Sequence, residues 1–356
     1  MWSGRVQAAL LGLIPCAVGL RWLAPDRQVL IFIVAGLAIV PLAGYIGRAT
    51  DDLASRLGAG IGGFLNATFG NAAELIISIV ALRHGLTNLV KASITGSIIS
   101  NVLLVFGAAA LAGGLRRQIV HFNRTAAGLG TTMLVLSAIA LVVPALFHRL
   151  SRNVPDAPEL RLDTEIAVVL LITYGLYLLF TLRTHREFYS AGIEADHSQR
   201  QRSTTSAVLQ LAGATAGVAV VSEILVDAVG AAARDLGASQ LFVGGVILAI
   251  IGNAAEHYSA VTLAWRGKMD AALQIAVGSS TQIALFVAPV LVLLSFVIAP
   301  EPMDLLFTTF ELTAMGLAVV IIAFVAHDGE THWMEGVQLL AVYVILALGF
   351  FFLPSP

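Results

Sequence analysis

The chain has 356 residues, of which 58% are hydrophobic and only 12% are charged, and its formal net charge is −2. Because soluble domains carry about 25% charged residues, this composition indicates an integral membrane protein, and the near-neutral charge argues against a nucleic-acid partner. The one cysteine, Cys16, excludes an internal disulfide framework and a cysteine-rich metal site.

Apolar stretches long enough to cross a bilayer recur along the whole chain. A transmembrane helix needs about 20 apolar residues, and clusters of Arg, Lys, Pro and Gly separate the stretches from one another. In chain order they lie near 6–23, 28–47, 57–82, 88–113, 122–147, 163–182, 205–230, 239–265, 270–299, 303–326 and 333–353. The sequence therefore predicts an all-α integral membrane protein with about eleven transmembrane helices. The third and eighth stretches are long enough to be tilted or interrupted.

Two segments stand apart from this series of spans. Residues 1–25 are interpreted as a retained lead helix, with a cleaved signal peptide as the alternative, because no small-residue cleavage site is evident. Residues 184–203 are polar and mixed in charge, which favours a solvated cytoplasmic linker at the midpoint of the chain. The alternative for this linker is a short regulatory helix carrying Glu187, Glu194 and Asp196.

The distribution of Lys and Arg predicts the orientation of the chain. Loops on the side of the N-terminus hold twelve of these residues and the opposite loops hold eight, with Lys91 counted among the eight. By the positive-inside rule, the N-terminus is expected in the cytoplasm and the C-terminus outside. The inner membrane of a bacterium is the expected location, because the chain is compact and lacks targeting tails.

The chain contains a duplicated unit. FGNAAELI at 69–76 is repeated as IGNAAEHY at 251–258, an offset of 182 residues. The same offset pairs Gly85 with Gly267 and Gly96-Ser97 with Gly278-Ser279, and FNRTAAGL at 122–129 resembles FELTAMGL at 310–317. Three matches in the same order indicate a repeat rather than a chance similarity.

The repeat divides the chain into a lead helix (1–25), a first five-helix repeat (26–183), the linker (184–203) and a second five-helix repeat (204–356). Because five is odd, the second repeat enters the membrane from the opposite side, so the two repeats are inverted. Two motif helices that cross near the midplane would bring Glu74 and Glu256 together, as at the shared sites of many secondary transporters.

The motif residues predict a cation site made of oxygen ligands. Asn71 and Glu74 are three residues apart and share a helix face, and Asn253 and Glu256 repeat this spacing. The glycine before each asparagine, Gly70 or Gly252, loosens the backbone and frees a carbonyl oxygen. Carboxylate, amide and backbone oxygens suit a hard cation such as Ca²⁺.

Further polar residues flank the predicted site. The neighbouring spans supply Ser97, Ser100, Ser279 and Gln282 at matched positions, although serines in membrane helices often bond to their own backbone. Glu223 and Asp227, one turn apart in the seventh span, form a candidate cation mouth, with capping at the membrane interface as the alternative.

The two glutamates also predict a mechanism of coupling. An acid inside the membrane is costly and usually functional; the alternative is a neutral carboxyl held by a local hydrogen bond. Without a cation, two neighbouring carboxylates in a low-dielectric site take up protons, and a bound divalent ion expels them. Proton and metal would then occupy the same groups at different times, which couples their opposed movements.

The sequence resembles the cation/proton exchanger family, known as CAX, of the calcium/cation antiporter superfamily. The resemblance covers the whole chain and rests on GNAAELI with SITGSIISN in one half and on GNAAEH with GSSTQ in the other. It implies Ca²⁺/H⁺ antiport with Glu74 and Glu256 as cation ligands and proton carriers. The surrounding residues would be Asn71, Asn253, Ser100 and Gln282. The chain departs from the family at the linker, which lacks the strongly acidic helix often found there.

Three other functions are alternatives to Ca²⁺/H⁺ antiport. Sodium-coupled relatives typically carry a G-T-S-x-P-[ED] element, which is absent here, so proton coupling is favoured over Na⁺ coupling. A cation channel is disfavoured, because channels usually build rings of ligands by rotational symmetry. An intramembrane metalloprotease would need an HExxH motif, which the chain lacks. The expected protein is a transporter in the lipid bilayer, not an enzyme, with no cofactor beyond the transported Ca²⁺ and H⁺.

Overall fold

The structure is a computed structural model that describes residues 10–151, 158–185 and 203–353. The described chain is helical almost throughout, and η marks π-helical turns that continue the α-helices. The first half contains α2 (Leu13–Leu23), α3 (Gln28–Phe69), α4 (Ala72–Arg83), α5 (Thr87–Ile99), η1 (Ser100–Val105), α6 (Phe106–Gly114), α7 (Arg124–Ser151), α8 (Glu159–Leu179) and η2 (Phe180–Thr184). The second half contains α10 (Thr204–Asp235), α11 (Gln240–Phe242), η3 (Val243–Leu248), α12 (Ala249–Gly252), α13 (Ala254–Trp265), α14 (Met269–Gln282), η4 (Ile283–Val287), α15 (Ala288–Ile298), α16 (Thr309–Val325) and α17 (Trp333–Phe352).

Seven helices in the described residues are long and apolar enough to cross a membrane, and the bent pair 240–252 and 254–265 raises the number to eight. Two further apolar helices, α2 and α16, have only 11 and 17 residues. The predicted number of eleven spans stays a prediction. The interior of the predicted linker, residues 186–202 with its three acids, lies outside the described residues, as do residues 1–9 of the lead segment.

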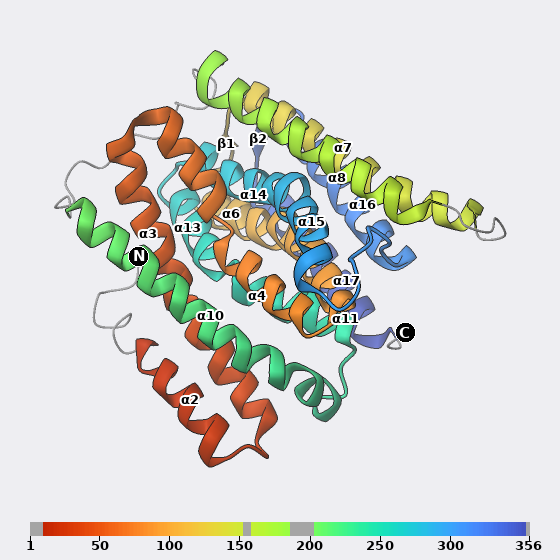
Figure 1. The fold of residues 1–356 in the computed structure, drawn as a ribbon. Helices are drawn as coiled ribbons and strands as arrows, with labels where there is room; N and C mark the ends of the chain where they lie inside the picture. The colour runs from red at the N-terminus through yellow and green to blue at the C-terminus, as the bar shows by residue number, and fades with distance from the viewer. Residues whose placement is uncertain (1–9, 152–157, 186–202, 354–356) are drawn as a thin grey trace.

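The third and eighth predicted spans are interrupted, as expected from their length. α3 does not run straight. A Cβ atom on Gly62 would overlap the backbone of Ala54, whereas in a straight ideal helix the two residues would be about 12 Å apart. The first limb of α3 therefore turns back into a second limb, residues 62–69, which ends before Gly70 (Figure 1). In the second repeat the chain bends by 59° between α12 and α13.

The long helices α3 and α10 pack side by side at one edge of the bundle, next to α2 (Figure 1). At the opposite edge α7 and α8 run together, and α4, α5, α6, α13 and α14 lie between the two edges. Following the predicted orientation, we call the end with Arg83 and Asp235 the outer side. At the inner side, β1 (Val120–His121) pairs antiparallel with β2 (Glu330–Thr331) and joins the two repeats.

The tenth predicted span begins later than the sequence suggests. Residues 303–307 are extended, with Met303, Leu305 and Phe307 buried, and α16 starts only at Thr309. Side chains replace the missing helical hydrogen bonds of this segment: Asp163 accepts from the Leu305 amide at 3.1 Å, and Lys91 donates to the Leu306 carbonyl at 3.0 Å. An apolar composition alone does not reveal such external partners.

The prediction that Lys91 lies in a loop is wrong. The residue lies within α5, is 7% exposed, and forms an ion pair with Asp304. A buried cation held by a carboxylate and a carbonyl oxygen contributes to packing between α5 and the 303–307 segment rather than to the charge of a loop. The count of loop charges on the outer side therefore falls by one, which strengthens the predicted asymmetry.

Candidate cation site

The repeated motif forms two equivalent helix breaks in the interior of the bundle. Asn71 and Asn253 occupy the N-cap positions of α4 and α13, and each motif glutamate follows in the first helical turn. Gly70 and Gly252 precede the breaks and are still helical, and the backbone departs from the helix at the asparagines, with φ −103° and ψ 30° at Asn71 and φ −88° and ψ 6° at Asn253. Each carboxylate thus lies near the N-terminus of its helix, the positive end of the helix dipole.

Asparagine and serine side chains join the two repeats in a reciprocal pattern. Asn253 Nδ2 donates to Ser97 Oγ at 3.0 Å, and Ser279 Oγ donates to Asn71 Oδ1 at 3.0 Å. Because Ser97 and Ser279 are equivalent in the duplicated sequence, each motif asparagine bonds to the serine of the other repeat. All four residues are at least nine-tenths buried. The predicted meeting of the two motifs is therefore present in the fold.

Asn101 is a site residue that the sequence analysis did not single out. Its Nδ2 donates to Asn253 Oδ1 at 3.3 Å and to Ser279 Oγ at 3.1 Å, so it links both halves of the network. The repeat comparison could not find it, because the residue 182 positions later is the apolar Ile283. The available signal was helical spacing, since Asn101 lies one turn beyond Ser97 on the same face.

The two glutamates approach each other across this network. Glu74 is 7% exposed and packs on the second break, where a Cβ atom at position 252 would lie 3.0 Å from its Cγ and Oε1 atoms. Glu256 is half-buried, has Ser279 as a hydrogen-bond partner, and lies within electrostatic range of Glu74. Position 252 thus requires glycine for space.

Several polar atoms of the cluster are buried and have no protein partner: Glu256 Oε2, Asn101 Oδ1 and Asn71 Nδ2. Buried polar groups are normally satisfied, so unsatisfied oxygens that gather at one place indicate a site for a cation or a proton. Among the described residues, no group of three His, Cys, Asp or Glu residues could hold a metal ion. A cation bound here would therefore depend on amide and hydroxyl oxygens in addition to the two carboxylates.

Two of the other predicted site residues, Gln282 and Ser100, have different positions. Gln282 lies beside the first break, where its Oε1 atom would be 3.5 Å from a Cβ atom on Gly70. Ser100 is fully buried, but its hydroxyl donates to the Ser97 carbonyl of its own helix at 3.2 Å. This is the backbone bonding that competes with ligation for helical serines; a ligand role for Ser100 stays a prediction.

The candidate cation mouth lies at the outer side, apart from the cluster. Glu223 and Asp227 project from α10, and both carboxylates are already engaged in ion pairs. Asp227 Oδ2 lies 2.6 Å from Arg21 Nη2, and Glu223 Oε1 lies 3.5 Å from Arg83 Nη1. Their cationic partners weaken the attraction for a free cation, so the role of a mouth gains no support from this arrangement and stays a prediction.

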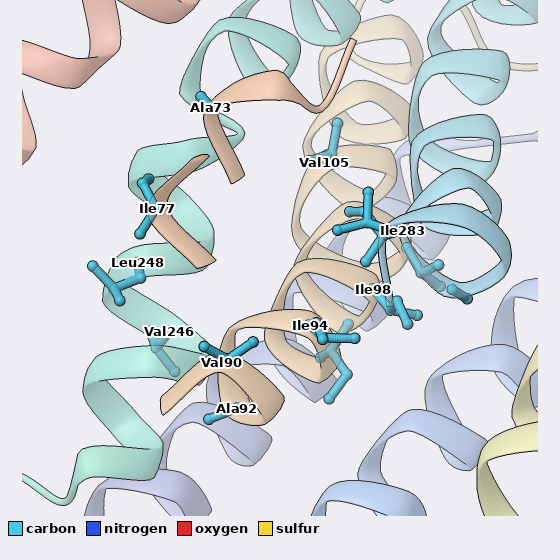
Figure 2. Packing of buried hydrophobic residues seen from close by; sticks show 14 of the residues in the cluster. Ala73, Ile77, Val90, Ala92, Ile94, Ile98, Val105, Val246, Leu248 and Ile283 are labelled. Atoms are coloured by element: carbon cyan, nitrogen blue, oxygen red, sulfur yellow. The ribbon is translucent and has the colours of Figure 1, made fainter. Parts of the chain in front are cut away.

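The two sides of the cluster differ in packing. On the outer side η3 packs so closely on α5 that a Cβ atom on Gly96 would overlap the backbone of Gly245. Figure 2 shows Val90 and Ala92 of α5 next to Val246 and Leu248 of η3. On the inner side, a Cβ atom at the equivalent glycine of α14, Gly278, would meet no atom within 4 Å. Among the described residues, packing is therefore tighter around Gly96 than around Gly278.

Comparison with known proteins identifies the family. The sequence pattern of the sodium/calcium exchanger protein family matches residues 27–183 and 206–352. The chain belongs to this family. A Ca(2+)/H(+) antiporter of Aphanothece halophytica is 42% identical, with 97% of this chain and 96% of that protein covered. The Ca(2+)/H(+) antiporter ChaA of Bacillus subtilis is 45% identical over 91% of this chain and 92% of its own length.

Solved structures of exchangers share the fold of this family member. The structure of native YfkE matches with a TM-score of 0.83 and 41% identity, covering 98% of this chain and all of that chain. The crystal structure of an H⁺/Ca²⁺ exchanger, CAX, matches with a TM-score of 0.72 over 97% of this chain, although the sequences are only 15% identical. These matches confirm the all-α membrane fold class and the exchanger family that the motifs indicated.

Proposed function

We propose that this exchanger-family chain moves Ca²⁺ across a membrane in exchange for H⁺ by alternating access, with Glu74 and Glu256 binding the cation and protons in turn. The observation that carries the proposal is the reciprocal asparagine–serine network, beside which the buried Glu74 of one repeat lies near the half-buried Glu256 of the other. The full-length relatives named as Ca²⁺/H⁺ antiporters support the choice of ions.

The chemistry of the cluster suits Ca²⁺ as the transported substrate. The two carboxylates supply the negative charge, and Asn101 Oδ1 is a buried oxygen without a protein partner. Ca²⁺ takes about six to eight oxygen ligands in flexible geometry. Reorientation of Asn71 and Asn253, which now bond to serines, would supply further amide oxygens. The ligand set we propose is therefore Glu74, Glu256, Asn71, Asn253 and Asn101, with Ser97, Ser279 and Gln282 lining the site.

The same carboxylates account for proton coupling. When Ca²⁺ leaves, two carboxylates in one dry site repel each other, and protonation removes that repulsion. Ca²⁺ binding requires that the protons depart first, because the charged carboxylates are its main ligands. A site that changes sides only when protonated or cation-loaded then exchanges one ion for the other.

The packing asymmetry supports an inward-facing state. The outer half is closed by η3 against α5, and the inner half near Gly278 is more open. With the N-terminus in the cytoplasm, as the loop charges predict, the open half faces the cytoplasm. We place the protein in the inner membrane of a bacterium, in keeping with relatives such as the antiporter of Bacillus subtilis.

Sodium coupling is the second candidate, because the matched family is described as sodium/calcium exchanger protein. The chain lacks the G-T-S-x-P-[ED] element, and its motif places alanines between the asparagine and the glutamate. Fewer oxygen ligands for Na⁺ are therefore available beside the carboxylates. Imposed proton and sodium gradients, applied separately, distinguish the two candidates.

The experiment is ⁴⁵Ca²⁺ uptake into proteoliposomes under an imposed pH gradient. We expect gradient-driven uptake by the native protein and loss of uptake in Glu74→Gln and in Glu256→Gln, since glutamine keeps the shape but removes the charge and the titratable proton. Glu165→Gln is the matched control, because Glu165 is an exposed carboxylate paired with Arg161 on α8. Uptake that ignores the pH gradient but follows a sodium gradient would replace proton coupling with sodium coupling. Normal transport by either site variant would overturn the shared-site mechanism.

A further inference from the structure

A cluster of charged side chains lies at the outer end of α4, away from the cation site. Arg83 ends α4 and His84 follows it, whereas Glu223 and Asp227 project from α10 one turn apart. His84 Nε2 lies 2.9 Å from Glu223 Oε2, and Arg83 Nη1 lies 3.5 Å from Glu223 Oε1. Arg21 of α2 pairs with Asp227. This outer charge cluster therefore ties α2, α4 and α10 together (Figure 1).

The outer charge cluster restrains α4, the helix that carries the site residue Glu74. α4 is a short, unbroken helix of 12 residues with Glu74 in its first turn and Arg83 at its end. The nine residue steps from Glu74 to Arg83 span about 14 Å of rigid helix. A restraint on Arg83 and His84 therefore limits how far the outer end of α4 can move away from α10. The outer end of α4 must move away from α10 before the outer half of the proposed transport path can open.

The equivalent positions of the second repeat do not carry the same side chains as this cluster. At the positions 182 residues later, Trp265 and Arg266 replace Arg83 and His84. The guanidinium of Arg116 lies over the Trp265 ring, 4.4 Å from its centroid, so an aromatic contact stands at the place of the Arg83 ion pair. The one-sided cluster lies on the same side as the closed packing of η3 on α5. Charge and packing thus favour the same state, although they come from different elements.

We propose that the outer charge cluster is a latch, which holds the outer half closed and makes the inward-facing state the resting state of the exchanger. The inference rests on the proposed alternating access and adds the element that sets its resting position. The side chains of the pair are partly exposed, at 60% for Arg83 and 36% for Glu223. A pair of this exposure shifts a two-state equilibrium by up to about fivefold. The latch therefore biases the exchanger without locking it.

The test measures the accessibility of two reporter cysteines in lipid nanodiscs, where a small hydrophilic thiol reagent reaches both sides. Cys16→Ala removes the exposed native thiol from the background. Val246→Cys reports the outer half, because Val246 is 8% exposed at the contact of η3 with α5 (Figure 2). Gly278→Cys reports the inner half, where a Cβ atom would contact nothing within 4 Å. Each reporter is combined with an unchanged latch, with Arg83→Glu, and with the charge swap Arg83→Glu plus Glu223→Arg.

We expect Arg83→Glu to place a third acid beside Glu223 and Asp227 and to break the latch by repulsion. Labelling at Val246→Cys should rise about fivefold while labelling at Gly278→Cys falls, because the population moves from the inward-facing to the outward-facing state. The charge swap should restore both rates, since it rebuilds an Arg–Glu pair with opposite polarity. High salt should raise outer labelling with the native latch and leave the Arg83→Glu protein little changed, because salt screens an attraction between exposed charges.

Three results would overturn the latch: unchanged rates in Arg83→Glu, a rise of both reporters together, or failure of the charge swap to restore them. A joint rise would mean general loosening rather than a change of side. The readout does not depend on transport, so it separates two failures. Absence of Ca²⁺/H⁺ exchange from proteoliposomes with reciprocal labelling intact would overturn the proposed function, whereas normal exchange with unresponsive labelling would overturn the latch alone.

Discussion

In the first copy of the GNAAE motif, the helical limb before the break leaves Phe64 and Asn66 exposed, whereas in the second copy η3 and α12 before the break pack against α5. The residues of the motif itself are used in the same way in both copies, with asparagine at the N-cap and glutamate in the first turn. The chemistry of the site is therefore nearly symmetric, and the access to it is not. An inverted repeat can reach a second state by exchanging the packing of its two halves while the central polar groups stay together.

The asymmetry extends into the site through the glycines that precede the breaks. A Cβ atom on Gly252 would lie 3.0 Å from Glu74, whereas one on Gly70 would lie 3.5 Å from the nearest atom of Gln282. In this state the carboxylate of the first repeat therefore rests on the backbone of the second. The reverse contact, Glu256 on Gly70, is not formed. The variants below test how much of the function depends on each unequal contact.

The largest effect is expected from Gly252→Ala. The added methyl group would force Glu74 to shift by a few tenths of an ångström. Because a displacement of about 1 Å in a preorganised site can cost about a hundredfold in rate, we expect ⁴⁵Ca²⁺ exchange in proteoliposomes to fall by roughly tenfold to a hundredfold. Gly278→Ala is the matched control, because its Cβ atom enters open space in the same repeat. Equal losses in both variants would show that the close contact with Glu74 is unimportant.

The pH dependence of Ca²⁺ binding tests whether both glutamates carry protons. Because protons and Ca²⁺ compete for the same carboxylates, the apparent affinity should fall as the pH falls. Linkage sets the size at up to about tenfold per pH unit for each proton displaced. Equilibrium ⁴⁵Ca²⁺ binding to the purified protein over a range of pH gives this slope. Glu74→Gln and Glu256→Gln should each bind Ca²⁺ more weakly and with a smaller slope. An affinity independent of pH in the native protein would exclude direct competition.

Asn101 is the one member of the network without a counterpart in the other repeat. Asn101→Ala removes the donor to both Asn253 and Ser279 and an unpartnered buried oxygen, so we expect a loss of about tenfold in apparent Ca²⁺ affinity. Ser100→Ala is the control, because Ser100 is its chain neighbour and bonds only to its own helix. The comparison is made from the Ca²⁺ dependence of uptake. A larger loss in Ser100→Ala than in Asn101→Ala would restore Ser100 as the ligand.

The contrast between Asn101 and Ser100 shows which parts of the site sequence reasoning can reach. Glu74, Glu256, Asn71 and Asn253 were found because each occurs twice, and repetition separates a functional polar residue from an incidental one. Asn101 occurs once, because the equivalent position of the second repeat is Ile283, so comparison of the repeats does not identify it. Its role depends on which face of α5 and η1 meets the second repeat, and this is a property of packing between helices distant in sequence.

The fold was predictable to a similar degree. Long apolar stretches identify membrane helices because the bilayer demands them, and the breaks at Gly70 and Gly252 followed from the motif. The extended segment at 303–307 was missed, since Asp163 and Lys91 stabilise it from other helices. The sharp turn within α3 was also missed: the first limb continues beyond the predicted end at residue 47 to Leu57, and the turn overlaps the start of the third predicted span. Errors thus occur where a partner distant in sequence overrides the local pattern.

The smallest effect is expected from a pair of glycines that differ only in their packing. Gly96 and Gly278 are equivalent in sequence, yet a Cβ atom on Gly96 would overlap Gly245 and one on Gly278 would contact nothing. Overpacking costs about 1–3 kcal/mol, and each kcal/mol lowers the midpoint of thermal unfolding by roughly 2–4 °C in chains of about 150–250 residues and by less in longer ones. We expect Gly96→Ala to lower the midpoint in detergent by a few degrees and Gly278→Ala to leave it unchanged. The close contact of α5 with η3 is expected only in the state with the outer half closed. Equal midpoints for the two variants would therefore mean that most molecules are not in that state.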